Sequence, residues 1–81
     1  MIKILIVPET CRAARALLNI SQSDLAKIAN LSKQTLVDFE RGARTPYPNN
    51  LLALQSALEN LGIVFVDADT KYGAGVRLIK R

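Results

Sequence analysis

The segment that most constrains the fold is Ser21–Gly42, with the sequence SQSDLAKIANLSKQTLVDFERG. It contains two short runs of helical spacing, separated by Asn30 at the point where the chain has to turn. Asn tolerates the left-handed backbone conformation better than most residues, although less well than Gly. The segment therefore predicts two short helices joined by a tight turn.

The first helix of this pair is predicted to start at Ser21. The Ser21 hydroxyl can accept a hydrogen bond from a free backbone amide, and Asp24 can bond back, as in a capping box whose usual second member is Glu or Gln. Leu25, Ile28 and Ala29 recur at i, i+3 and i+4. This spacing predicts one apolar stripe that faces the core.

The second helix is predicted from about Lys33 to Arg41. Ser32 can cap its start, and Gly42 stands where a helix commonly ends. Leu36 and Phe39 supply its buried side. Polar residues are left on the outside, mostly in the first half of the helix.

Those polar residues are of the types that read bases. Gln can form two hydrogen bonds with adenine, Lys can donate to guanine, and a Thr methyl can contact thymine. A helix that presents such groups at its N-terminal end is typical of one that enters the major groove of DNA. The polar row consists of Lys33, Gln34, Thr35 and Asp38.

Taken together, these features resemble the phage repressor/Cro-like, or Xre-type, helix-turn-helix family over roughly residues 12–61. The combination is fairly specific, whereas each piece alone is weak. The resemblance implies a mostly α, lambda-repressor-like domain of four to five helices that binds DNA. The residues that carry it are Arg15, Ser21, Gln22, Leu25, Ala26, Leu31, Ser32, Phe39, Glu40, Arg41 and Gly42.

The resemblance also implies roles for individual residues. Lys33, Gln34 and Thr35 would face bases or nearby phosphates, and Asp38 falls at another base-facing position. Gln22, Arg44 and Thr45 would contact backbone phosphates. The family pattern further pairs an Arg of the opening helix with the Glu near the end of the recognition helix, here Arg15 and Glu40, and we interpret this pair as structural.

Asp38 leaves two interpretations open. Its carboxylate could accept a hydrogen bond from the amine of a cytosine. Alternatively, it could pair with Arg41 at i+3, another candidate DNA-binding residue, and read nothing. We favour the pairing, because charges at this spacing are usually part of a solvated helix face.

Two further helices are predicted around the motif. The first spans Pro8–Leu18, since Pro suits the first turn of a helix, and Cys11 packs there as a small apolar residue. The last runs from about residue 49 or 50 to Leu61, with Gly62 closing it. A leucine stripe marks its core side and comprises Leu51, Leu54, Leu58 and Leu61.

The remaining segments have strand character. Residues 63–66 and 76–79 are rich in β-branched and aliphatic side chains, and the turn-forming DADTKYGAG lies between them. They predict a short C-terminal β-hairpin, and residues 2–7 could add a third strand. We expect a single domain over 1–81, with a helix-turn-helix core at 8–62 and a hairpin appended at 63–80.

Composition narrows the classes of function. The chain has 81 residues, a net charge of +4, one cysteine and no histidine. An internal disulfide is excluded, and we expect no metal site, no cofactor and no catalytic residues, because general-base and metal chemistry lack their usual side chains. The apolar start is too short for a membrane span or a signal peptide, so we expect a cytoplasmic protein.

These observations lead to three hypotheses. The first is a sequence-specific regulator of transcription that binds double-stranded DNA and acts by occupying an operator, as a homodimer on an inverted repeat. The second is a small antiactivator- or antitoxin-like regulator that binds a protein partner through its last helix or the hairpin. The third is a structural helical domain that has lost DNA contact, which only Asp38 favours.

Overall fold

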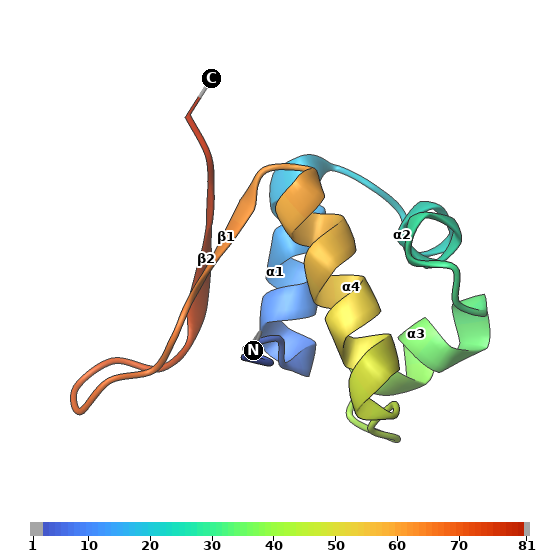
Figure 1. Ribbon diagram of the computed structural model, residues 1–81, viewed down its shortest axis with the longest axis horizontal. Helices are drawn as coiled ribbons and strands as arrows, with labels where there is room; N and C mark the ends of the chain where they lie inside the picture. The colour runs from blue at the N-terminus through green and yellow to red at the C-terminus, as the bar shows by residue number, and fades with distance from the viewer. Residues whose placement is uncertain (1–2, 81) are drawn as a thin grey trace.

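The computed structural model describes residues 3–80, which form four helices and one two-stranded hairpin (Figure 1). The mostly α fold class with a C-terminal hairpin is therefore confirmed. Each predicted helix and each strand of the predicted hairpin lies within two residues of its expected bounds. In chain order, the elements are α1 (Pro8–Leu18), α2 (Gln22–Ala29), α3 (Lys33–Glu40), α4 (Pro48–Asn60), β1 (Ile63–Val66) and β2 (Gly75–Leu78).

Local signals set the ends of the two central helices. Ser21 Oγ accepts a hydrogen bond from the amide of Asp24 at 3.0 Å, and Ser32 Oγ accepts one from the amide of Thr35 at 3.1 Å. Asn30, at the turn between the helices, has φ 60° and ψ 44°. Asn30 therefore adopts the left-handed conformation, which Asn tolerates because its short polar side chain can form local hydrogen bonds.

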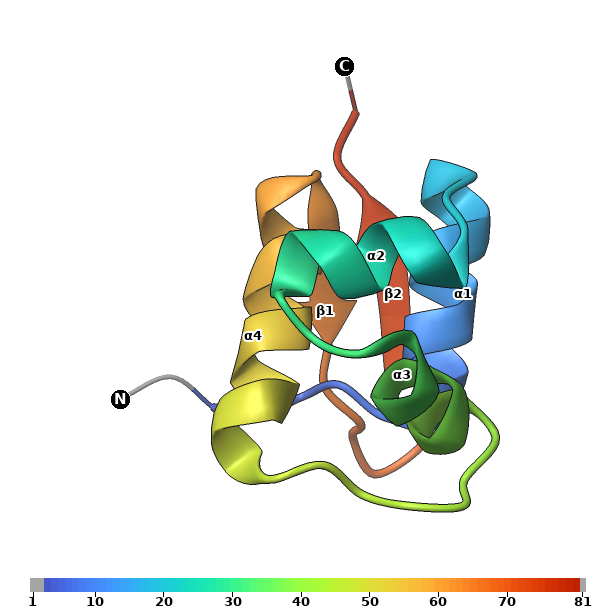
Figure 2. The ribbon, with the colours of Figure 1, turned by 90° about the vertical axis from the view of Figure 1, so that its right-hand side faces the viewer.

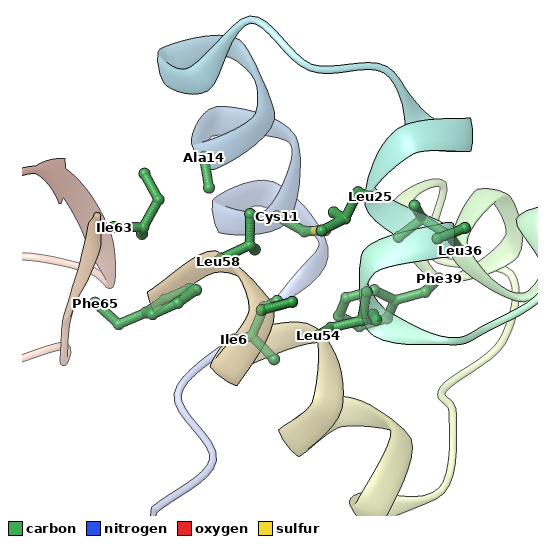
Figure 3. Close-up of a cluster of buried hydrophobic side chains, with 13 residues drawn as sticks. Ile6, Cys11, Ala14, Leu25, Leu36, Phe39, Leu54, Leu58, Ile63 and Phe65 are labelled. Carbon is green, nitrogen blue, oxygen red and sulfur yellow. The ribbon is translucent and has the colours of Figure 1, made fainter. Parts of the chain in front are cut away.

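The core forms where the four helices meet (Figure 3). Leu25, Leu36, Leu54 and Leu58 are completely buried, and burying each contributes about 1.5–3 kcal/mol. The predicted stripe on α2 needs one correction, since Ile28 is 52% exposed. The short helix turns its i, i+1 and i+4 positions inward, so that Leu25, Ala26 and Ala29 are the buried residues.

The hairpin covers the side of α1 and α4 that faces away from α2 and α3 (Figure 1). Its strands are antiparallel, with Ile63 opposite Leu78 and Phe65 opposite Val76. Ile63 and Phe65 are buried against the helices, whereas Val64 and Val66 point outward. The alternation along β1 therefore gives the hairpin one packed face and one exposed face.

The N-terminal arm does not add a third strand over residues 3–7, and Ile2 lies outside the described residues. Its backbone is bound by one buried side chain of α4 instead. Gln55 Oε1 accepts hydrogen bonds from the amides of Leu5 at 2.7 Å and Ile6 at 3.1 Å, and Gln55 Nε2 donates to the carbonyl of Lys3 at 3.0 Å. These bonds satisfy the backbone groups that a strand would use.

Across residues 3–80, no helix is both long and apolar enough to cross a membrane.

Candidate nucleic-acid interface

A buried carboxylate fixes the placement of α3. Glu40, at the end of α3, is only 2% exposed. Its Oε2 accepts a hydrogen bond from Nε of Arg15 in α1, and its Oε1 accepts one from Nη2 of the same residue, both at 2.7 Å. Gln22 Nε2 of α2 donates to Oε1 at 2.9 Å. The predicted Arg15–Glu40 pair is thus present as a two-pronged contact, and it joins all three helices.

The same carboxylate accepts a fourth hydrogen bond, from a residue that the sequence did not indicate. The thiol of Cys11 donates to Glu40 Oε2 at 3.1 Å, and Cys11 is completely buried. Burial raises the pKa of Cys11, and Glu40 raises it further. Burial would also raise the pKa of Glu40, but its hydrogen bonds, from Arg15 first, outweigh burial and lower that pKa. Cys11 is therefore a protonated donor beside an ionised acceptor.

With its inner side held in this way, α3 presents its first half to solvent. Lys33 and Gln34 are exposed, and Thr35 is half-buried, with its hydroxyl 2.7 Å from Ser32 Oγ. Seen from the side of α2 and α3, the hairpin lies behind the helices (Figure 2). The hairpin therefore does not shield the polar row.

The loop after α3 brings further predicted residues to the same place. Gly42 has φ 76°, and the amides of Ala43 and Arg44 both bond to the carbonyl of Asp38, at 2.8 and 3.3 Å. This fold-back creates a groove of about 480 Å³ between α3 and the loop that leads into α4. The predicted site residues that line it are Gln34, Thr35, Asp38, Arg44 and Thr45.

The Asp38 carboxylate accepts hydrogen bonds from two neighbours along α3. Gln34 Nε2 donates to Asp38 Oδ1 at 2.9 Å, and Arg41 Nη2 and Nε donate to the same oxygen at 3.2 and 3.3 Å. The hydrogen bond from Gln34, followed by those from Arg41, lowers the pKa of Asp38. The predicted pairing with Arg41 is present, and the bond to Gln34 adds a partner that we did not expect.

Gln22 lies apart from the groove. It is half-buried and lines a shallow depression beside Arg12, Val37 and Arg41. One of its two N–H groups is already used by Glu40, which leaves the other available. Lys33 does not line the groove but is exposed at the start of α3.

Sequence reasoning did not select four other residues that line the groove: Ser32, Pro46, Tyr47 and Asn50. Tyr47 is the most exposed of the large hydrophobic side chains in residues 3–80, at 79% exposure. Its position between Pro46 and Pro48 is the one signal that could have identified it. Pro48, the first residue of α4, restricts Tyr47 before it to an extended backbone conformation outside the helix, which favours an exposed side chain.

Comparison with known proteins identifies the class of this arrangement. A family model described as helix-turn-helix matches residues 12–63. The chain belongs to the phage repressor/Cro-like (Xre-type) helix-turn-helix family, as its sequence resemblance implied. No curated protein matches the chain.

A solved structure of the family is similar in three dimensions. It is the DNA-binding domain of the phage P22 c2 repressor, residues 1–76, which was compared with that of the 434 repressor. The two chains are 34% identical, and the match covers 72% of this chain and 76% of that chain, with a TM-score of 0.62. The lambda-repressor-like fold is therefore shown.

Proposed function

We propose that the protein is a sequence-specific regulator of transcription that binds double-stranded DNA and acts by occupying an operator. The observation that carries this proposal is the exposed polar row at the start of α3, which a buried ion pair holds outward. The similarity of the chain to the DNA-binding domain of the P22 c2 repressor supports the same function. A helix supported in this way can enter a major groove as one rigid unit.

The proposed contacts divide by position. Lys33, Gln34 and Thr35 stand at the tip of α3, where a helix in the major groove meets base edges. Arg44 and Thr45 line the far wall of the groove, where a phosphate of the same strand would lie. Gln22 would bind a phosphate through its remaining N–H, and Arg41 would keep the charge of Asp38 from repelling the DNA backbone.

We further propose that a homodimer binds an inverted repeat. A single recognition helix reads only a few base pairs, so two copies with half-sites about one helical turn apart would supply the specificity that one copy lacks. The hairpin also has strand edges that pair with nothing else among residues 3–80, and such edges can add a strand from a second copy.

The test is a titration against duplexes selected from a random pool and against unselected duplex, at two salt concentrations. We expect tighter binding to the selected duplex and weaker binding to both as salt rises. Lys33→Ala or Gln34→Ala should cost about 1–3 kcal/mol on the selected duplex only. Arg44→Ala should weaken binding to both duplexes alike.

The matched control is Lys80→Ala, which also removes one exposed positive charge but lies two residues after β2, the strand that packs on the side of α1 away from α3. It should leave the preference for the selected duplex unchanged. Equal affinity of the wild-type protein for selected and unselected duplexes would refute sequence-specific binding. Analytical ultracentrifugation of the protein with a selected duplex should give two copies per duplex, and one copy would refute the dimer.

One observation favours a second function, namely an antiactivator- or antitoxin-like regulator that binds a protein partner. Val64 and Val66 on the outer face of the hairpin are 49% and 43% exposed, and Ile79 beyond β2 is 57% exposed. This apolar surface lies away from α3, so both functions could coexist. Replacing Val64 and Val66 with Lys should abolish regulation in the cell while leaving duplex binding intact if this function dominates.

A further inference from the structure

Three side chains on the outer face of α3 form one hydrogen-bonded row. Gln34, Asp38 and Arg41 stand at i, i+4 and i+7, so they are neighbours along the same helix face. Asp38 is in the middle, and its Oδ1 accepts from Gln34 at 2.9 Å on one side and from Arg41 at 3.2 and 3.3 Å on the other. The row therefore couples Gln34, which we propose to contact a base, to a carboxylate.

Asp38 is poorly placed to read a base itself. Its side chain is 14% exposed, whereas that of Arg41 is 66% exposed. Three N–H groups already converge on one of its oxygens. A cytosine amine would have to compete with these donors for Oδ1, and the phosphates of a bound duplex would repel the negative charge of the carboxylate.

Gln34 gains a definite orientation from the contact. A carboxamide has one acceptor oxygen and two N–H donors, and it can rotate by half a turn so that these exchange places. In the rotated form, Gln34 Oε1 would face the Asp38 carboxylate, and two oxygen acceptors would repel each other. Asp38 thus selects the orientation in which Gln34 Nε2, and not Oε1, faces the Asp38 carboxylate.

This orientation leaves a particular pattern of groups for DNA. One N–H of Gln34 is held by Asp38, and the other N–H and Oε1 are left as a donor beside an acceptor. Adenine offers the complementary pair in the major groove, an N7 acceptor beside an N6 donor, whereas guanine offers two acceptors. A fixed carboxamide can discriminate between them, while a freely rotating one can donate to guanine as well.

We propose that Asp38 is a positioning residue, which orients the Gln34 carboxamide for adenine in the major groove and does not itself contact a base. The inference rests on the proposed function of the protein. The lowered pKa of Asp38 is consistent with it, since the carboxylate stays ionised at neutral pH and cannot offer a proton to Gln34 Oε1.

The test compares base preferences, position by position, for the wild type, Gln34→Ala and Asp38→Asn, with duplexes drawn from a random pool. Asp38→Asn keeps the size of the side chain but can face Gln34 with either an oxygen or an N–H. We expect it to lower the preference for adenine over guanine by roughly tenfold, a factor that corresponds to about 1.4 kcal/mol. The affected position should be the one that Gln34→Ala affects.

The control is Asp24→Asn, which removes the same charge from an exposed position in the first turn of α2. It should change the affinity for all duplexes alike and leave every base preference in place. Asp38→Asn acting at a different base pair from Gln34→Ala would show that Asp38 reads a base directly and would overturn the proposal. An unchanged preference in Asp38→Asn would overturn it as well.

A second readout does not require DNA. In nuclear magnetic resonance spectra of the free protein, the Nε2 proton resonances of Gln34 should shift in Asp38→Asn and stay in place in Asp24→Asn. Resonances that do not shift in Asp38→Asn would overturn the contact itself. A wild type that holds this contact but shows no base preference would instead refute the proposed function, so the two failures can be told apart.

Discussion

The carboxylate of Glu40 explains how eight-residue helices can hold a fixed mutual arrangement. Its hydrogen-bond partners Arg15 and Gln22 belong to α1 and α2, and Arg12 of α1 also donates to its backbone carbonyl. A buried charge that loses one partner keeps its desolvation cost, so breaking such a pair costs more than the pair contributes in net terms. This contact should therefore dominate the stability of the site.

Removing Arg15 tests that argument. We expect Arg15→Ala to lower the free energy of unfolding by about 3 kcal/mol, because Glu40 would remain buried without its main counter-charge. Urea denaturation followed by circular dichroism measures the loss. Lys27→Ala on the exposed face of α2 is the control and should change stability by less than about 0.5 kcal/mol. Equal effects of the two substitutions would contradict a structural role for the pair.

The lowered pKa of Glu40 predicts how stability depends on pH. The folded protein holds Glu40 ionised to lower pH than the unfolded chain does. The resulting stabilisation is complete above the unfolded pKa, about 4.3, and is lost as the pH falls through the folded pKa. Denaturation between pH 7 and pH 3 should therefore show a steeper loss of stability in the wild type than in Glu40→Gln. Parallel curves would contradict this account.

Two of the turns that join the elements contain a glycine with a positive φ. Gly62, between α4 and β1, has φ +105°, and a Cβ there would lie 2.9 Å from Ile79 Cγ2. Gly42 has φ +76° with open space around it, and Gly73 in the hairpin loop has neither feature. The three glycines thus separate the effect of backbone strain from the effect of crowding.

We expect a graded response when each of these glycines is replaced by alanine. Gly73→Ala should leave the free energy of unfolding almost unchanged, while Gly42→Ala should cost about 1–2 kcal/mol for the left-handed conformation. Gly62→Ala should cost more than Gly42→Ala, because Ile79 and the end of β2 must shift too. Thermal unfolding of the three variants gives the order, and a Gly62→Ala variant as stable as Gly73→Ala would show that the hairpin is not held by this turn.

Most of the fold could be predicted from the sequence because its signals are local. Ser21, Ser32 and Asn30 mark helix ends through bonds that reach three or four residues, and these ends were predicted to within one or two positions. The N-terminal arm could not be predicted in this way. Its partner Gln55 lies about 50 positions away in sequence. From its sequence alone, an apolar segment such as ILIV could equally well pair with a strand.

The candidate site likewise combines features that local sequence signals predict with contacts that arise only when the helices pack. The polar row of α3 follows from helical spacing alone, and the exposed positions Lys33 and Gln34 were predicted from it. The bond between Gln34 and Asp38 also lies at a helical spacing, i to i+4, but several rotamers satisfy that spacing. The thiol of Cys11 meets Glu40 only because α1 and α3 pack together, and no sequence pattern encodes that contact.

Across the molecule, two exposed surfaces lie on opposite sides of the layer formed by α1 and α4. The helix-turn-helix pair lies on one side and the hairpin on the other (Figure 1). Duplex bound at α3 would therefore leave the outer face of the hairpin free. A second partner or a second copy bound at the hairpin would contact the protein without displacing the DNA.

A bulky label at either surface tests this separation. Cys11 is buried and its pKa is raised, so it should resist a maleimide while the protein is folded, and an introduced cysteine becomes the reactive thiol. Val64→Cys carrying a polyethylene glycol maleimide should keep its affinity for a duplex with one half-site. Thr45→Cys with the same label should lose tenfold or more in affinity for that duplex, about 1.4 kcal/mol, because Thr45 lines the groove beside α3.

Fluorescence anisotropy measures both affinities, and a single half-site removes any contribution from dimer contacts. If the label at position 64 weakened binding as much as the label at position 45, the duplex would have to reach the hairpin, and the separation of the two surfaces would be wrong.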